Sequence, residues 1–339
     1  MAFRTIVGQE RAIRFLQQAL ESTRLAHAYL FYGPNGTGKK LTALQFTKAL
    51  YCSTLVIDAC DTCVACRKVA TGNHPDLLMM HLEGSAVRID DIRTIQHRLS
   101  YRPYEHHRTT IILDGCETLT LPAANALLKT LEEPPESALI ILLTCKKDAL
   151  PLTILSRCQL VPFRPLTPSH IQIILERHGV DSATANIAAA LAEGSLETYT
   201  PADCATMLVN RHTAYTLLQE VGQSKGVSIF NQARQLAGRR AQCEALLHWL
   251  TLLCRDLVML HVAPSVPLYN HDLRSELFLL TQRLSVERLL DTYTLIEKLR
   301  QYLTMNINSQ LIFEHLLVYF QQILASAALS GIRRDASFT

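Results

Sequence analysis

The chain has 339 residues, of which 48% are hydrophobic, with 33 basic residues against 30 acidic ones and a formal net charge of +3. This length is enough for two or three domains with buried cores, and the near-balance of charge excludes a chain that binds nucleic acid over its whole surface. No uninterrupted apolar run approaches the roughly 18 to 20 residues that cross a bilayer, and the N-terminus lacks the apolar core of a signal peptide. We therefore expect a soluble, cytoplasmic protein with no membrane contact, which meets nucleic acid only locally or through a partner.

The first 165 residues alternate between helical and strand patterns. Apolar residues recur at three- and four-residue steps between Gly8 and Arg24, which predicts an amphipathic helix. The aromatic-rich run 28–32 predicts a buried strand, and residues 39–51 predict the helix that follows it. Further strands are predicted at 77–81, 109–114 and 138–144, and further helices at 90–100 and 123–132. This alternation is typical of a parallel α/β sheet with helices on both faces.

A glycine-rich turn from Gly33 to Lys40 lies between the first strand and its helix. In the phosphate-binding motif G-x-x-x-x-G-K-[ST], backbone N–H groups surround phosphate oxygens, the Lys reaches the β- and γ-phosphates, and the final hydroxyl binds Mg²⁺. Gly36, Gly38 and Lys39 fit this motif, but Lys40 replaces the hydroxyl, and an ammonium group cannot ligate Mg²⁺. Binding of ATP or ADP without magnesium stays open, because the backbone and two ammonium groups could still hold phosphate.

The second nucleotide element of such ATPases is an acid at the end of a strand, followed by a Glu that polarises the attacking water. Asp114 ends the strand 109–114, but Gly115 occupies the next position and Glu117 comes only later. The loop and the strand have therefore each lost a chemical group that hydrolysis needs. Together they predict a site that is built like that of an ATPase and does not hydrolyse ATP.

Four of the ten cysteines fall within fifteen residues, as C-x7-C-x2-C-x2-C at Cys52, Cys60, Cys63 and Cys66. Four thiolates at this spacing can surround one tetrahedral zinc ion and leave no open coordination position. We therefore expect a structural zinc module at 52–66, the alternative being four unliganded thiols. The other cysteines are scattered and are expected to be core residues: Cys116, Cys145, Cys158, Cys204, Cys243 and Cys254.

Beyond Pro165 the sequence is helical, with no convincing strand. Helices are predicted at 171–178, 183–193, 202–209, 241–261 and 286–303. The predicted division is an α/β domain at 1–165, a helical lid domain at 166–210, a helical collar domain at 211–330 and a tail at 331–339.

Several segments, in order, resemble the bacterial clamp-loader subunits of the AAA+ superfamily. They are Ile6-Val-Gly-Gln9, His27-Ala-Tyr-Leu-Phe31, the loop at 33–40, the four cysteines, Asn125-Ala-Leu-Leu-Lys-Thr-Leu-Glu-Glu-Pro-Pro135, Leu155-Ser-Arg-Cys158 and, near the C-terminus, Asn306-Ile-Asn308 with Leu311 and Phe313-Glu314. The likeness is specific through residue 165, weak through the middle helices and moderate after about residue 285. It implies an AAA+ fold with a zinc module, a helical lid and an all-α collar.

The resemblance also implies roles for single residues. The family's active ATPase subunits, gamma and tau, carry Thr after the loop Lys, an Asp-Glu pair and a Gly-Ser-x-Arg motif, where this chain has Lys40, Gly115 and Glu197. Arg157 matches the family's arginine finger, which acts on the neighbouring subunit's nucleotide, and Thr144 matches its polar sensor. These losses and retentions resemble the non-hydrolysing delta-prime type of subunit.

This resemblance implies other clamp-loader subunits, gamma or tau and delta, as partners, and a sliding clamp and primer-template DNA reached through the assembly. One alternative is an active gamma-type ATPase, in which Thr42 would supply the missing hydroxyl, although it points about 200° away from Lys40 around the helix. Another is a helicase-loader or recombination AAA+ protein that binds DNA directly. The four-cysteine insertion and Ser156-Arg-Cys158 fit that class poorly.

Overall fold

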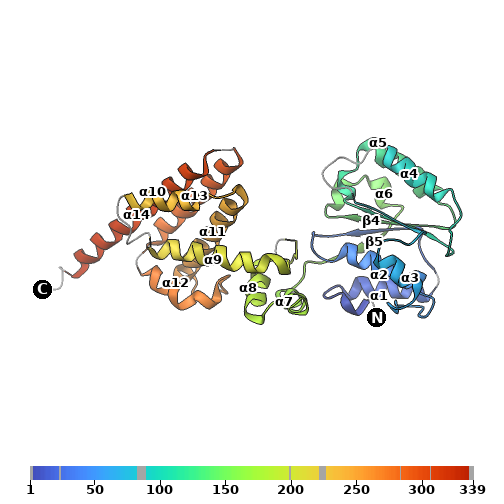
Figure 1. Cartoon of the computed structure of the whole chain (residues 1–339), viewed down its shortest axis with the longest axis horizontal. Helices are drawn as coiled ribbons and strands as arrows, with labels where there is room; N and C mark the ends of the chain where they lie inside the picture. Colours follow the sequence, from blue (N-terminus) through green and yellow to red (C-terminus); the bar gives the residue numbers. More distant parts are fainter. Residues whose placement is uncertain are drawn as a thin grey trace. The chain divides into compact units, whose positions relative to one another are not determined.

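The computed structural model describes residues 3–22, 24–81, 89–197, 200–220, 227–282, 284–305 and 307–335. The chain forms two compact units (Figure 1), one of Met1–His178 with Ala192–Thr200 and one of Gly179–Leu191 with Pro201–Thr339. The predicted domain limits at 165 and 210 stay a prediction. Asn306 and residues 336–339 lie outside the described residues.

The first unit is built on a parallel sheet of five strands in the order β2-β3-β4-β1-β5. The strands are β1 (Ala28–Tyr32), β2 (Leu77–His81), β3 (Thr109–Asp114), β4 (Ala138–Thr144) and β5 (Gln159–Pro162). The predicted parallel α/β sheet is thereby confirmed. The sequence patterns miss β5, because this edge strand has four residues, mostly exposed or half-buried, and ends in a proline.

Helices cover both faces of this sheet (Figure 1). One face carries α1 (Glu10–Glu21), α2 (Lys39–Tyr51) and α3 (Val64–Ala70), and the other carries α4 (Ile89–Leu99), α5 (Leu121–Glu132) and α6 (Leu152–Leu155). Alternate residues of β4 enter opposite cores: Leu139, Ile141 and Leu143 face α1 to α3, whereas Ile140 and Leu142 face α4 to α6. Because both faces are buried, the strand is a continuous apolar run. Helix α7 (Pro168–Arg177) completes this unit.

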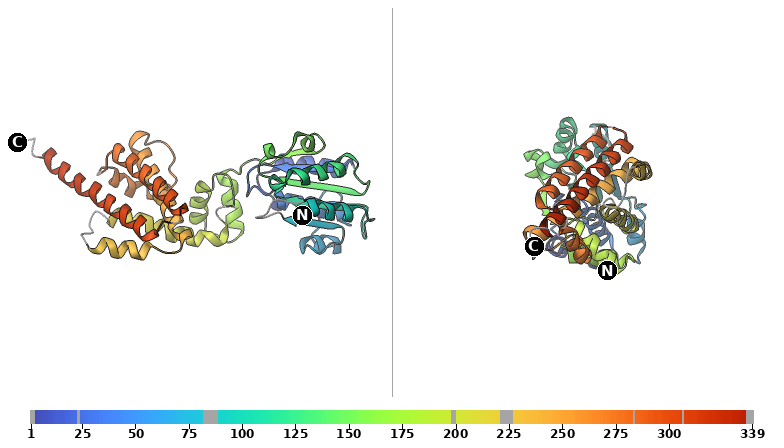
Figure 2. Two further views of the ribbon diagram at one scale, coloured as in Figure 1. Left: turned by 90° about the horizontal axis from the view of Figure 1, so that it is seen from above. Right: turned by 90° about the vertical axis from the view of Figure 1, so that its left-hand side faces the viewer.

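Within its described residues, the second unit consists of helices joined by loops and contains no strand. It contains α8 (Ser182–Leu191), α9 (Pro201–Glu220), α10 (Val227–Leu236), α11 (Arg240–Val262), α12 (Arg274–Thr281), α13 (Val286–Thr304) and α14 (Ser309–Asp335). The sequence analysis does not predict α10, α12 or α14. Helices α10 and α13 both pack against α14, the long red helix of Figure 2, which extends into the predicted tail.

Helix α11 forms the core of the second unit. It packs against α9, α12 and α13 and buries Leu247, Leu250, Leu253 and Leu257 completely. Among the described residues it is the one helix long and apolar enough to span a bilayer, but 56% of its apolar window is buried in the protein. Core helices have this composition too, and the contacts of α11 account for its apolar residues.

Two histidines, the buried His74 and the half-buried His106, join the end of α2 to the start of β2 and β3. The Tyr51 ring stacks on His74 and His106, with ring centroids 4.6 and 4.5 Å away, and its hydroxyl donates to Asp76 O at 2.8 Å. The Asp76 carboxylate accepts the backbone N–H groups of Tyr104, Glu105 and His106 at 2.6 to 2.9 Å. Burial lowers the pKa of both histidines.

These histidines predict a loss of stability in mild acid. As the pH falls below about 6.5, the histidine pKa in an unfolded chain, the unfolded state binds protons that the folded state does not, so the free energy of unfolding decreases. We expect His106→Phe, which retains an aromatic ring against Tyr51, to reduce the fall in melting temperature between pH 7.5 and 5.5. Exposed His107→Gln is the control, and an unchanged pH dependence in His106→Phe would contradict the prediction.

Candidate functional site

The predicted phosphate-binding loop lies at the carboxyl end of β1, between that strand and α2. The structure brings Gly33, Gly36, Gly38, Lys39 and Lys40 together in this turn, as predicted from the sequence. Two positions require glycine. A Cβ atom on Gly33 would lie 2.1 Å from Phe163 O, and one on Gly36, whose φ is +65°, would lie 2.4 Å from Ser195 Oγ.

The Lys39 ammonium is bonded to its own loop. Its Nζ donates to the carbonyl oxygens of Gly33 and Pro34, each at 2.7 Å. Burial lowers the pKa of Lys39, although the nearby Cys145, Glu117 and Asp114 oppose this effect. The loop's own carbonyl groups therefore satisfy the group that would otherwise reach a phosphate.

Lys40 lies beside the acid at the end of β3. Its Nζ is 3.6 Å from Asp114 Oδ2, and the two side chains are 43% and 20% exposed. In P-loop ATPases the loop hydroxyl and this acid hold Mg²⁺. Here the Lys40 ammonium lies beside Asp114, the acid that corresponds to the one that holds Mg²⁺ there. Thr42 is no replacement ligand, because it is fully buried and its hydroxyl donates to Gly38 O at 2.9 Å.

Glu117 belongs to a cluster with the residues at the end of β4. Its Oε2 accepts hydrogen bonds from Thr144 Oγ1 at 2.8 Å and Cys145 N at 3.2 Å, and its Oε1 accepts from Cys145 Sγ at 2.9 Å. Burial opposes ionisation, but these hydrogen bonds hold the pKa of Glu117 below its usual range. Position 115, where a hydrolysing site would carry Glu, is a glycine with φ +87°. The sequence analysis did not predict the Glu117–Thr144 pair. This contact depends on the pairing of β3 with β4, which no local sequence pattern specifies.

A short segment of residues 195–197 contacts the loop directly. Ser195 Oγ donates to Asn35 O at 2.8 Å, and Leu196 N donates to Gly36 O at 3.2 Å. Asn35 Nδ2 donates to Glu197 Oε1 at 3.2 Å. Glu197 is the residue at which the resemblance leads us to expect an arginine in an active subunit. The segment is therefore joined to the loop by the protein's own groups.

Arg157 directly follows α6 and is only about one-third exposed. Its Nη2 lies 2.8 Å from Glu132 Oε1, and its Nη1 donates to Thr153 O at 2.9 Å and Ser156 Oγ at 3.3 Å. Within the described part of the chain, no hydrogen bond or ion pair joins Arg157 to the loop at 33–40. Arg157 is thus separate from its own subunit's phosphate-binding loop.

The four clustered cysteines converge as the sequence predicts. Cys52 follows α2, Cys60 lies in the connection, and Cys63 and Cys66 lie at the start of α3. Their sulfur atoms all lie within 4.8 Å of one another, and the Cys60 and Cys66 sulfurs are 4.0 Å apart. Four thiolates at a Zn–S distance of about 2.3 Å have sulfurs about 3.8 Å apart, so the cluster fits one tetrahedral ion.

Hydrogen bonds to sulfur favour the thiolate form of Cys60 and Cys63. Hydrogen bonds from Thr62 and the Cys63 N–H lower the pKa of Cys60 to about 5. Further backbone N–H groups donate to sulfur, from Leu55 to Cys52 and from Cys66 to Cys63, each at 3.4 Å. Burial instead raises the pKa of Cys66 to about 12, so metal binding would have to displace its proton.

The other cysteines lie outside this cluster. Five of the six are buried, and Cys145 is the half-buried one that donates to Glu117.

A second group of metal-binding residue types contains His74, Glu105 and His106, whose ligand atoms lie within 4.8 Å of one another. His74 Nδ1 accepts the N–H of Asp76 at 3.1 Å, so the proton of the neutral ring lies on Nε2. Nε2 is the atom that would face the metal, because Nδ1 is already engaged. Ligating histidines have the opposite arrangement, in which the second nitrogen donates its proton. This group is therefore a hydrogen-bonded and stacked cluster.

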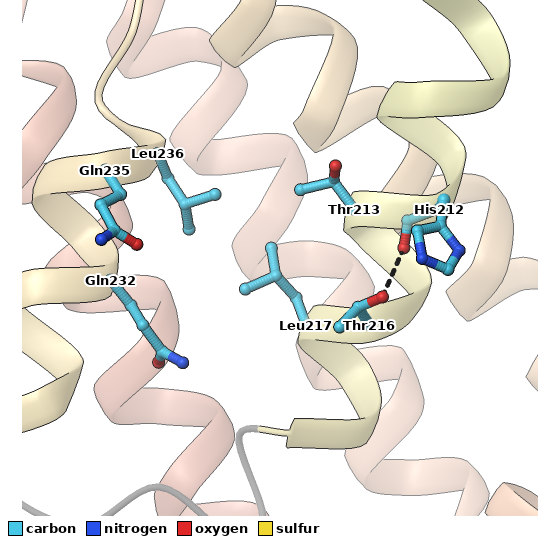
Figure 3. Close-up of a pocket in the computed structure, with 7 residues that line it drawn as sticks. All are labelled: His212, Thr213, Thr216, Leu217, Gln232, Gln235 and Leu236. Carbon is cyan, nitrogen blue, oxygen red and sulfur yellow. Dashed lines mark hydrogen bonds between the residues drawn. The ribbon is translucent and has the colours of Figure 1, made fainter.

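One cavity lies within the second unit. It has a volume of about 300 Å³ and lies between α9 and α10 (Figure 3). Its lining residues are His212, Thr213, Thr216, Leu217, Gln232, Gln235 and Leu236. The described residues that line it include no Lys, Arg or carboxylate, which are the groups that bind a nucleotide phosphate or a magnesium ion.

Two family models match the chain. The model described as DNA polymerase III, delta subunit matches residues 8–167, and the one described as DNA polymerase III, delta subunit, C terminal matches residues 209–322. Between them they cover both the α/β unit and most of the helical unit.

The chain is similar to DNA polymerase III subunit delta′ of Bacillus subtilis, with 29% identity over 317 residues, 93% of this chain and 96% of that protein. It is 37% identical to subunit tau of the same organism over 201 residues, 57% of this chain and 36% of that protein. The chain thus spans well under half the length of the tau relative. A solved DNA polymerase III gamma subunit-related protein from Thermotoga maritima is 21% identical, with 92% of this chain and 99% of that chain covered and a TM-score of 0.42.

The two family models follow one another along the chain, and the delta-prime relative matches nearly the whole of it. The chain therefore belongs to the family of DNA polymerase III clamp-loader subunits of the delta-prime type, which is related to gamma and tau.

Proposed function

We propose that this chain is a non-hydrolysing member of the clamp loader. In this role it caps a ring of ATPase subunits, supplies Arg157 to the neighbouring subunit's nucleotide and helps to load the sliding clamp on primed DNA. Its partners are the gamma or tau and delta subunits, and it meets the clamp and primer-template DNA through the assembly. The observation that carries this proposal is the Lys40 ammonium 3.6 Å from the Asp114 carboxylate.

The Lys40–Asp114 pair supports the absence of hydrolysis in this subunit. A magnesium ion would have to displace an ammonium group that is covalently tethered beside the acid, and position 40 would offer it no hydroxyl, while the Thr37 hydroxyl of the loop donates to Pro34 O at 2.8 Å. Gly115 offers no carboxylate to the attacking water, and the nearby Glu117 is engaged by Thr144 and Cys145. Position 40 therefore offers no ligand to magnesium, and position 115 offers no catalytic base, although phosphoryl transfer needs both.

The segment 195–197 supports weak nucleotide binding. Its hydrogen bonds to Asn35 and Gly36 join it to the loop without any ligand. A nucleotide phosphate would also have to draw Lys39 away from two carbonyl oxygens at 2.7 Å. Binding would thus replace existing hydrogen bonds, and the net gain would be small.

The side chain of Arg157 has the chemistry of an arginine finger. A guanidinium group has five N–H donors; the hydrogen bonds to Thr153 and Ser156 use two of them, and Nη2 lies in an ion pair with Glu132. The Nε–H and one Nη2–H have no partner among the described residues. Two donors on a partly exposed cation can stabilise the charge that develops on a transferring phosphoryl group.

We further propose that the four-cysteine cluster holds zinc. The ion would join the end of α2 to α3. The four sulfurs would fill its coordination shell and leave no open position, so its role would be structural.

The purified chain should not hydrolyse ATP with Mg²⁺ and primed DNA, and Lys39→Ala should change nothing in that assay. Lys40→Thr, which removes the ammonium beside Asp114 and restores a hydroxyl, should strengthen Mg²⁺-dependent binding of a labelled nucleotide by about tenfold, the effect of one added ligand interaction. Turnover and nucleotide titration measure these effects. Robust turnover that Lys39→Ala abolishes would instead identify an active gamma-type ATPase.

In an assembly with active subunits, Arg157→Ala should lower DNA-stimulated hydrolysis at the neighbouring site by about 10³-fold, because an arginine finger is worth 10³ to 10⁵ in rate. Steady-state ATP turnover of the reconstituted complex measures this. Arg157→Lys retains the charge without the planar fork and should recover only part of the rate. Full turnover in the Arg157→Ala complex would rule out the finger role.

Metal analysis of the purified chain should find zinc, and removing it with a chelator should lower the melting temperature. Cys63→Ser should lose the metal, because it removes one of four ligands. Cys145→Ser, outside the cluster, is the matched control and should retain a full zinc content. Equal metal content in the two variants would exclude the proposed ligand set.

A further inference from the structure

Glu132 is the acidic partner of Arg157 and comes from a different helix. It is the last residue of α5, whereas Arg157 follows α6, and these helices pack together on one face of the sheet. Glu132 Oε1 lies 2.8 Å from Arg157 Nη2, and the two side chains are 50% and 35% exposed. An ion pair at this exposure adds little to folding stability.

The position of Glu132 in its helix is electrostatically unfavourable. The C-terminus of a helix carries a partial negative charge, so a carboxylate in the last turn is repelled there. Glu132 ends α5 and the acidic Glu133 caps it. The positive charge of nearby Arg157 offsets this repulsion. The ion pair therefore has an electrostatic reason and is more than a chance contact of two surface charges.

We propose that Glu132 is a positioning residue for the arginine finger. It holds Nη2 while Thr153 O and Ser156 Oγ hold Nη1, so both ends of the guanidinium are fixed from its own subunit. The Nε–H and the second Nη2–H remain for a phosphate of the adjoining subunit. This inference rests on the proposed function, and within it assigns a role to a residue that does not touch the nucleotide.

The physical benefit is orientation. Arginine has many rotamers, and a finger that is already held loses less conformational freedom when it meets the phosphate. A carboxylate at one corner and a carbonyl at the other also fix the plane of the fork. The effect belongs to the reaction step, because the developing charge is what the oriented donors stabilise.

The test is ATP turnover in the reconstituted clamp loader on primed DNA. Glu132→Ala should lower the Arg157-dependent hydrolysis by about tenfold, mainly in kcat, with KM for ATP little changed. Glu132→Gln, which has the same shape, should retain part of the rate because its amide oxygen still accepts a hydrogen bond. Glu133→Ala removes the neighbouring carboxylate and is the matched control, with full turnover expected.

A double variant separates positioning from a general structural role. Arg157→Ala with Glu132→Ala should be no slower than Arg157→Ala alone, because Glu132 acts only through the arginine. Melting temperatures of all variants should stay close to that of the starting chain, as for other surface substitutions.

The failures of the two proposals are distinguishable. If Arg157→Ala leaves turnover intact, the finger role fails and this inference fails with it. If Arg157→Ala slows hydrolysis but Glu132→Ala leaves it equal or faster, the finger stands and the positioning role of Glu132 is overturned.

Discussion

The site depends on the parallel direction of the strands. Because β1, β3 and β4 run the same way, their carboxyl ends meet at one edge, where Tyr32 is level with Thr144 and Asp114 is level with Leu143. The strands are apolar on both faces and sealed by helices, so the polar groups that follow them are confined to that edge. This arrangement brings the loop, the acid at the end of β3 and the polar residues after β4 within reach of one another.

At that edge, the charged side chains pair with other groups of the same chain. Lys40 lies beside Asp114, the loop carbonyls accept from Lys39, and Thr144 and Cys145 donate to Glu117. Hydrolysing sites instead leave such groups available to magnesium, phosphate and water. Arg157 of the same chain has no hydrogen bond or ion pair to the loop at 33–40 among the described residues, and some of its N–H donors have no partner there. These two features are the ones on which the proposed function rests: a site whose charged groups are engaged within the chain, and a cation that the proposal assigns to a neighbouring subunit.

The sequence predicts those parts of the structure that local patterns encode. The turn at 33–40 has glycines at fixed offsets, β4 is a continuous apolar run, and the cysteines are close in the chain, so each is legible in a short window. The edge strand β5 is too short and too polar to produce a strand pattern. Contacts such as Ser195 with Asn35, or Glu132 with Arg157, join distant segments, and no local pattern specifies them.

Lys40 also changes how the charge at this edge depends on the concentrations of magnesium and nucleotide. A magnesium site fills and empties with the free concentrations of metal and nucleotide, so its local charge follows the energy state of the cell. An ammonium on a side chain of the protein is present at a constant, high effective concentration and at every ratio of ATP to ADP. In the proposed assembly, the surroundings of Asp114 would therefore keep the same charge through each cycle of the neighbouring ATPases, and this subunit would be a member of the ring whose electrostatics stay constant.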